Sequence, residues 1–131
     1  TAFNDVSARD VQTRTSQWLQ GKTLDTFGPM GPCIVTLDEI NDIGNLEISL
    51  ILNGKIMQSS NTKNLIFSVQ EIVSYLSEIM TLEVGDVIST GTPGGVGVLH
   101  NPPVFLNEGD VVEVHLEGVG KLINSVVKSL D

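Results

Sequence analysis

The stretch Leu46-Glu-Ile-Ser-Leu-Ile-Leu-Asn-Gly-Lys-Ile-Met-Gln58 decides the fold class of this chain. Residues 46–52 first alternate apolar and polar side chains and then become apolar, which is typical of a β-strand that enters a core. Asn53-Gly54 is the strongest short signal for a two-residue hairpin turn, and residues 55–58 return as a second strand. The stretch therefore predicts a β-hairpin near the middle of the chain.

Further strands are expected on both sides of this hairpin. Residues 111–116 alternate cleanly, and Val112, Val114 and Leu116 lie on one side of the expected strand. After a short glycine-containing turn, residues 122–127 return as its neighbour. Two shorter apolar runs are also expected to be strands, namely residues 33–37 and residues 86–90.

Two helices are expected beside these strands. Ser68-Val-Gln-Glu71 is a capping box, and it predicts a helix that runs to about Met80. The apolar face of that helix would consist of Ile72, Val73, Leu76, Ile79 and Met80. Nearer the start, Ser7 is a good N-cap, and Asp10, three residues later, is in position to complete a capping box. This pair predicts a helix from Ser7 to about Leu19. These elements predict one domain over residues 1–131, mostly β with two helices (α+β), built as a sandwich or roll.

Composition restricts the classes of function. The chain has 131 residues, of which 40% are hydrophobic and 18% are charged, as is typical of a folded globular protein. Its net charge of −9 argues against nucleic acid or an anionic membrane as a partner. No apolar run reaches the length of a membrane span, and no signal peptide is visible. The single cysteine, Cys33, is expected to be a buried thiol in a reducing compartment.

Several polar residues could do chemistry, although each also has an ordinary structural explanation. Asp5 ends an extended segment just before a helix, and Arg9 and Gln12 share one face of that helix. A capped surface helix with an exposed ion pair explains this segment equally simply. Lys22, taken alone, is a solvated lysine. The glycine-rich run 91–97 could allow close approach of a ligand or only form a turn.

Three motifs in order carry a family resemblance. They are Asn4-Asp-Val-Ser-Ala-Arg-Asp10, Gly21-Lys-Thr-Leu-Asp-Thr-Phe-Gly-Pro-Met-Gly-Pro32 and Gly85-Asp-Val-Ile-Ser-Thr-Gly-Thr-Pro-Gly-Gly-Val-Gly97. From about Ala2 to about Val127 the chain resembles the C-terminal catalytic domain of the fumarylacetoacetate hydrolase family. It is most similar to the small fumarylacetoacetate hydrolase domain-containing proteins and to the 2-hydroxyhepta-2,4-diene-1,7-dioate isomerase and hydratase relatives. The resemblance implies a mixed β-sandwich roll and a metal-dependent enzyme that acts on small oxo-acids.

The resemblance implies that Asp5 is a metal ligand. The cofactor would be Mg²⁺ (or Mn²⁺, Ca²⁺), because a carboxylate suits a hard cation and the chain has no His/Cys cluster for zinc. The other ligands in the family, a Glu-x-Glu pair, lie upstream. The chain begins at Thr1 inside a motif and without a methionine, so we expect it to be N-terminally incomplete. Such a fragment is expected to fold and to self-associate, but to bind Mg²⁺ no more tightly than about millimolar and to lack turnover.

The resemblance also implies which residues meet the substrate. Lys22, Gln12 and Arg9 would be the catalytic residues, which polarise the oxo groups and support a developing enolate. Thr92 and Gly91 would bind a substrate carboxylate.

Neither histidine is expected to be the general base. The base in the family, where it is known, is a His–Glu pair upstream of the matching region. His115 lies on the Glu-bearing side of its strand and is expected to be solvated, while His100 is expected to be structural. Asp86 is expected to cap a turn.

Hydrolysis of a C–C bond is the first activity that the resemblance implies, with an acylpyruvate or a fumarylacetoacetate-like 1,3-diketo acid as substrate and an enolate as intermediate. Isomerases or hydratases and oxo-acid decarboxylases of aromatic catabolism use the same kind of intermediate and are alternatives. A non-catalytic, acid-binding β-domain is an alternative of another class. The expected partners are the oxo-acid and a second copy of the chain in a homodimer. A cytoplasmic location is expected, with a mitochondrial location as the alternative.

Overall fold

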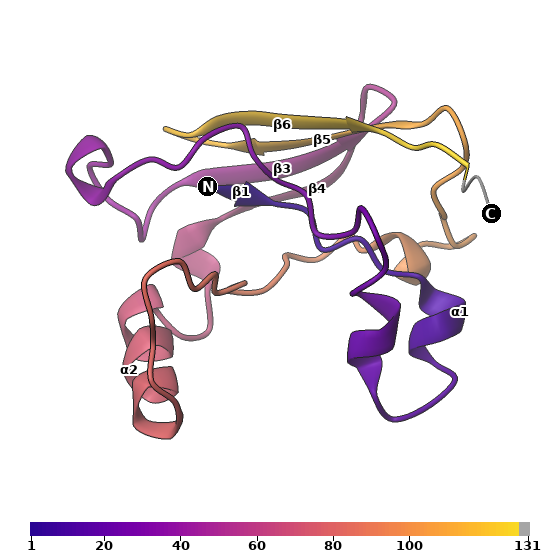
Figure 1. Cartoon of the computed structure of the whole chain (residues 1–131). Helices are drawn as coiled ribbons and strands as arrows, with labels where there is room; N and C mark the ends of the chain where they lie inside the picture. Colours follow the sequence, from indigo (N-terminus) through magenta and orange to yellow (C-terminus); the bar gives the residue numbers. More distant parts are fainter. Residues whose placement is uncertain (129–131) are drawn as a thin grey trace.

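The computed structural model describes residues 1–128, which form two antiparallel sheets and a few short helices (Figure 1). The strands are β1 Ala2–Phe3, β2 Met30–Gly31, β3 Glu47–Leu52, β4 Lys55–Asn61, β5 Val111–Leu116 and β6 Gly120–Ser125. The α-helices are α1 Arg9–Gln12 and α2 Val69–Ile79, and the 3₁₀ turns are η1 Trp18–Gly21, η2 Leu37–Glu39, η3 Thr62–Asn64 and η4 Gly97–Leu99. The expected fold class, mostly β with two helices, is confirmed.

The central hairpin of β3 and β4 is confirmed. Asn53 and Gly54 both have positive φ, 49° and 79°, as a two-residue turn that matches the strand twist requires. The larger sheet has the order β4-β3-β5-β6, and every neighbouring pair is antiparallel. The smaller sheet pairs β1 with β2. The predicted strands near residues 111–116 and 122–127 are thus also confirmed.

The core lies on one face of the larger sheet, which we call the inner face. Ala2, Val114 and Leu122 are buried there, and the half-buried Leu50 and Leu116 pack against them. β1 contacts β5 and β6 on this face, and α1 and α2 lie on the same side of the sheet (Figure 1). The opposite, outer face carries the intervening residues of each strand, because side chains alternate along a strand.

Helix α2 begins as its sequence predicts. The Ser68 hydroxyl accepts a hydrogen bond from the backbone N–H of Glu71, and the Glu71 carboxylate accepts one from the backbone N–H of Ser68. The apolar face of α2 remains accessible: Val73, Ile79 and Met80 are 40%, 61% and 51% exposed. Ile72 and Leu76 are half-buried, so the described residues cover this face only in part. No helix among them is both long and apolar enough to span a bilayer.

The predicted strands at residues 33–37 and 86–90 are wrong. Within residues 1–128 neither run pairs with another strand, and without a partner an extended segment makes no ladder of hydrogen bonds. Cys33 is exposed, so the prediction of a buried thiol is also wrong. Asp86 does cap a turn, since its Oδ2 accepts a hydrogen bond from the backbone N–H of Glu83 at 2.8 Å.

The helix predicted from Ser7 to Leu19 is mostly absent. Helix α1 covers four residues, its N-cap is Ala8, and the Ser7 hydroxyl donates to the Asp5 carbonyl instead of capping. Thr13 and Thr15 explain the early end, because their hydroxyls bond the backbone locally and compete with the helix. The chain turns there and resumes as η1.

Candidate active site

Asp5 and Lys22 form the centre of the candidate site. The Lys22 Nζ atom lies 2.5 Å from the Asp5 Oδ2 atom and donates to the Ser7 Oγ atom at 3.0 Å. The Lys22 and Asp5 side chains are 30% and 40% exposed, so the ion pair is accessible to a small ligand. The sequence did not single out Ser7 for this contact, because its pattern indicated a helix cap.

Arg9 and Gln12 stand on one face of α1, as predicted. The Arg9 Nη1 atom donates to the Gln12 Oε1 atom at 2.5 Å. Gln12 is only 3% exposed, whereas Arg9 is half-buried. The bond holds the guanidinium in place, and its other N–H groups remain able to donate to an anionic oxygen.

Gly21 joins the two parts of this site. A Cβ atom at Gly21 would lie 2.6 Å from the Gln12 Cβ atom and 2.8 Å from the Ala8 carbonyl oxygen, so only glycine fits where η1 meets α1. The Gly21 carbonyl in turn accepts a hydrogen bond from the backbone N–H of Ala8 at 2.9 Å. This close approach places Lys22, the next residue, beside Asp5.

The glycine-rich run forms a second group around Thr92. Gly91 has a φ of 117°, in the left-handed region that favours glycine, and Thr92 is exposed. Gln58 of β4 donates to the Thr92 hydroxyl at 3.0 Å and to the Pro93 carbonyl at 2.7 Å. No signal in the sequence pointed to Gln58, because its position in the returning strand is compatible with either face of the sheet.

Both groups lie on the inner side of the larger sheet. Gln58 pairs with Leu50, whose side chain belongs to the inner face, and Ala2 of β1 packs on that face just before Asp5. Figure 1 shows α1 and the chain after α2 on this side. Among residues 1–128 no hydrogen bond or ion pair joins Thr92 to the cluster around Lys22.

Asp5 fits a hard cation as one ligand. The part of the chain that the structure describes contains no group of three His, Cys, Asp or Glu side chains that could hold a metal. One oxygen of Asp5 is engaged by Lys22. Mg²⁺ commonly uses one or two carboxylates together with waters and substrate oxygens, so a single carboxylate here suits part of such a site.

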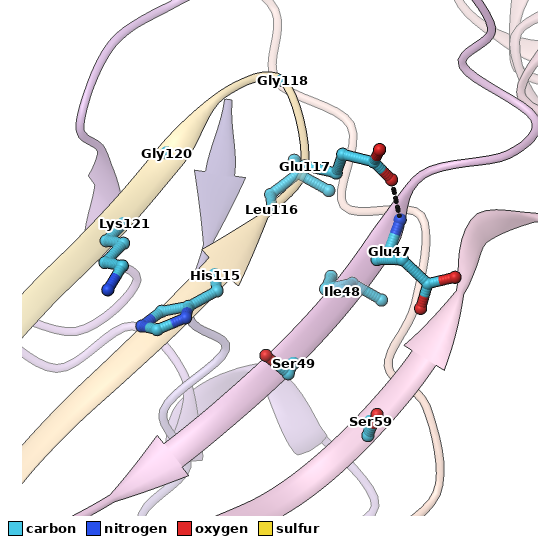
Figure 2. A pocket seen from close by; sticks show the side chains of 10 residues that line it. All are labelled: Glu47, Ile48, Ser49, Ser59, His115, Leu116, Glu117, Gly118, Gly120 and Lys121. Atoms are coloured by element: carbon cyan, nitrogen blue, oxygen red, sulfur yellow. Dashed lines mark hydrogen bonds between the residues drawn. The ribbon is translucent and has the colours of Figure 1, made fainter. Parts of the chain in front are cut away.

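A hollow of about 380 Å³ lies on the outer face, away from these groups. Figure 2 shows Ser49, His115 and Lys121 across its floor on β3, β5 and β6. The His115 Nε2 atom lies 2.9 Å from the Glu113 Oε2 atom, and both side chains are 26% exposed. His115 is thus paired rather than simply solvated, and it does not face the inner side. His100 contacts the Gly95 carbonyl at 2.9 Å, in agreement with a structural role.

Fold and site together define a class: an antiparallel β domain that carries an Asp5–Lys22 ion pair and an Arg9–Gln12 pair on the inner side of its larger sheet. The chain matches the family described as fumarylacetoacetate hydrolase, C-terminal, over residues 1–127. It therefore belongs to the fumarylacetoacetate hydrolase family, which confirms the resemblance seen in the sequence.

Relatives that are about 50% identical over the aligned residues include enzymes. The mitochondrial oxaloacetate tautomerase of Rattus norvegicus is 51% identical over 128 residues, which make up 97% of this chain and 41% of that protein. An uncharacterized protein of Archaeoglobus fulgidus is 52% identical over 98% of this chain and 47% of its own length. This chain thus spans less than half the length of these relatives.

Solved structures agree with the fold. Fumarylacetoacetate hydrolase from Exiguobacterium antarcticum superposes with a TM-score of 0.93 at 46% identity, over 97% of this chain and 46% of that one. The 2-hydroxyhepta-2,4-diene-1,7-dioate isomerase from Mycobacterium marinum superposes with a TM-score of 0.86 at 43% identity, over 98% and 47%. The chain is therefore a domain of a family that contains hydrolases, isomerases and tautomerases.

Proposed function

We propose that the protein acts on small oxo-acids by stabilising an enolate at the cluster around Lys22. The observation that carries the proposal is the accessible Lys22 ammonium, which Asp5 and Ser7 hold in a defined position. Arg9 lies on α1, which packs against η1 just before Lys22. Two cationic groups near one accessible surface favour a substrate that carries a carboxylate and develops negative charge on an oxo oxygen.

Keto–enol tautomerisation is the first reaction to test. One proton leaves the carbon beside the oxo group and one proton arrives on the oxo oxygen, so no atom is gained or lost. Lys22 and Arg9 would stabilise the charge on that oxygen between the two transfers, and Gln12 would orient Arg9. The name of the rat relative, an oxaloacetate tautomerase, supports oxaloacetate as the first substrate.

Hydrolysis of a C–C bond, which the sequence placed first, is the second candidate. Water adds to a carbonyl carbon and gives up a proton, the adjacent C–C bond breaks, and its electron pair departs as an enolate. Lys22 would stabilise this enolate until it takes up a proton. The hydrolase from Exiguobacterium antarcticum supports this candidate. In either reaction a bound Mg²⁺ or Mn²⁺, with Asp5 as one ligand, would supply Lewis-acid polarisation of the oxo group.

The test compares two variants of the complete protein in the presence of Mg²⁺. Lys22→Met keeps the apolar stem and removes the charge, so kcat should fall about 100-fold or more. Lys55→Met, at the exposed start of β4, is the matched control and should leave kcat unchanged. The assays follow enol loss from oxaloacetate and, separately, pyruvate release from an acylpyruvate. Unchanged turnover in Lys22→Met would contradict the role of Lys22.

A wild-type protein that binds an oxo-acid without converting it would instead support the non-catalytic, acid-binding alternative.

Homodimer formation and cellular location are further proposals. The exposed apolar face of α2 supports self-association. The mitochondrial location in the name of the rat relative supports the mitochondrial alternative over the cytoplasmic one.

A further inference from the structure

Gln58 makes the only hydrogen bond to the Thr92 hydroxyl within residues 1–128. Its Nε2 atom donates to the Thr92 Oγ1 atom at 3.0 Å and to the Pro93 carbonyl at 2.7 Å, with the Gly94 carbonyl at 3.5 Å. Carbonyl oxygens only accept hydrogen bonds, so the amide nitrogen of Gln58 must face the loop. The Thr92 oxygen is therefore an acceptor in this contact.

The direction of this bond has a chemical consequence. A threonine hydroxyl has one hydrogen and two lone pairs. Because Gln58 occupies a lone pair of Thr92, the hydroxyl hydrogen stays free to donate away from β4. A hydroxyl that donates is what a carboxylate oxygen requires, since an ionised carboxylate only accepts.

A β-bulge places Gln58 on the inner face. Leu50 pairs with Gln58, whereas the next residue of β3, Ile51, pairs with Ile56, so Met57 is the extra residue. With regular pairing Met57 would lie opposite Leu50, and Gln58 would lie opposite Ser49 on the outer face. The single extra residue thus transfers Gln58 to the side that carries the glycine-rich run.

The bulge also receives the loop itself. Gly95 has a φ of 95°, and a Cβ atom there would overlap the carbonyl oxygen of Met57. The Gly95 carbonyl contacts the His100 ring at 2.9 Å. The loop is therefore held against β4 at two points. The backbone at Gly95 contacts Met57, and Thr92, three residues earlier in the loop, is bonded to Gln58, the next residue of the strand.

We infer that Gln58 is a positioning residue, which fixes the Thr92 hydroxyl as a donor toward the carboxylate of the substrate. The inference rests on the proposed function and on the role that the family resemblance implies for Thr92, which is to bind that carboxylate. Gln58 touches Thr92 and not the reacting atoms, so it acts on substrate binding rather than on the proton transfers.

The experiment measures KM and kcat of the complete protein for oxaloacetate with Mg²⁺ in Gln58→Met, Thr92→Val and the double variant. Gln58→Met should raise KM about 10-fold and leave kcat within about twofold, because the hydrogen bond from Thr92 to the substrate carboxylate would weaken equally in the ground state and the transition state. Thr92→Val should raise KM at least as much. In the double variant, loss of Gln58 should add nothing to the effect of Thr92→Val. Gln70→Met, an exposed glutamine on α2, is the matched control and should match wild type.

A second variant keeps the test decisive if Gln58→Met unfolds. Gln58→Glu has the same shape, but its carboxylate accepts the Thr92 hydrogen and repels the substrate, so KM should rise more than in Gln58→Met. An effect of Gln58 that is additive with Thr92→Val, or that lowers kcat while KM is unchanged, would overturn the positioning role and leave the proposed function standing. If Thr92→Val leaves KM unchanged while Lys22→Met still loses turnover, the inference fails and the proposed function stands. If the wild type converts neither oxaloacetate nor an acylpyruvate, the proposed function fails and the inference fails with it.

Discussion

Asp5 and Lys22 show how two residues that are separated in sequence share one task. Each alone is an ordinary surface residue, and an exposed ion pair contributes little to stability. Their contact at 2.5 Å, with Ser7 as a third partner, instead holds an ammonium in a fixed place next to an accessible carboxylate. This arrangement supports the proposed role of the pair in ligand binding.

The first residue-scale prediction concerns the metal. Asp5→Asn should weaken Mg²⁺ or Mn²⁺ binding to the complete protein by more than the roughly 10- to 100-fold that follows loss of an outer hydrogen-bond partner, because an anionic ligand is lost. Titration calorimetry with the metal alone measures this. Asp38→Asn, an exposed carboxylate on η2, is the control and should bind the metal like wild type. Equal affinity of Asp5→Asn and wild type would remove Asp5 from the ligand set.

Short elements position the site, and they pack too closely at Gly21 to accept a larger side chain there. Helix α1 has four residues and η1 also has four, so neither is stable by itself. They hold each other through the close contact at Gly21 and the hydrogen bond from Ala8 to the Gly21 carbonyl. The geometry of Lys22 therefore depends on one glycine.

Gly21→Ala should separate η1 from α1. The new Cβ atom meets backbone atoms that cannot rotate away, so the free energy of unfolding should fall by about 1–3 kcal/mol. Turnover should fall at least about 10-fold, because Lys22 is displaced from Asp5. Gly44→Ala is the control, since a Cβ atom there meets only a side-chain oxygen of Asp42. The checks are thermal unfolding and kcat; wild-type values for both in Gly21→Ala would contradict the prediction.

The capping box predicts how α2 responds to pH. Hydrogen bonds from the Ser68 hydroxyl and the Ser68 backbone N–H hold the pKa of the Glu71 carboxyl below its ordinary value of 4.5. A carboxyl whose pKa is lowered in the folded state stabilises it at pH values above 4.5, and the contribution is lost as the pH falls through the lowered pKa. Glu71→Gln should therefore weaken α2 at neutral pH and matter less near pH 3.

Ser68→Ala tests the other half of the box. It should destabilise α2 by about 1 kcal/mol at pH 7, whereas Ser77→Ala, in the last turn of the helix, should not. Amide hydrogen exchange of residues 69–79 at the two pH values gives the readout for both variants. Equal protection of wild type, Glu71→Gln and Ser68→Ala at pH 7 would show that the box does not hold the helix.

At the scale of the molecule, one sheet buries its inner face only in part. The buried core is small, and apolar side chains such as Ile66 (91% exposed) and Phe67 (62% exposed) face solvent together with one face of α2. Exposed apolar surface of this extent favours association. The net charge of −9 makes copies of the chain repel one another, but salt screens this repulsion.

We therefore expect residues 1–131 alone to fold and to self-associate. Light scattering should give a mass above that of one chain, and Val73→Lys together with Ile79→Lys should shift the mass toward the monomer, because both residues lie on the exposed apolar face of α2. Ser74→Lys, on the opposite side of the helix, should not shift it. A monomeric wild type would contradict the prediction.

The site was predictable as a set of residue types but not as a geometry. The spacing of Arg9 and Gln12 predicted that they share one helix face, because residues three apart on a helix are neighbours, and the two side chains are in contact there. The contact between Asp5 and Lys22 spans 17 positions and depends on a turn between α1 and η1 that replaced the expected long helix. Gln58 could not be predicted, because its face depends on a bulge in the pairing with β3.

The sequence by itself determined the elements whose signals are local: the Asn53-Gly54 hairpin, the capping box at Ser68 and the alternation of β5. In each, the deciding interactions join residues that are at most a few positions apart, so the neighbours are known before the chain folds. The tertiary structure alone decided which extended runs found a partner, and residues 33–37 and 86–90 found none among residues 1–128. It also decided on which side of the sheet Gln58 lies, because pairing register is a property of two strands and one extra residue exchanges the faces.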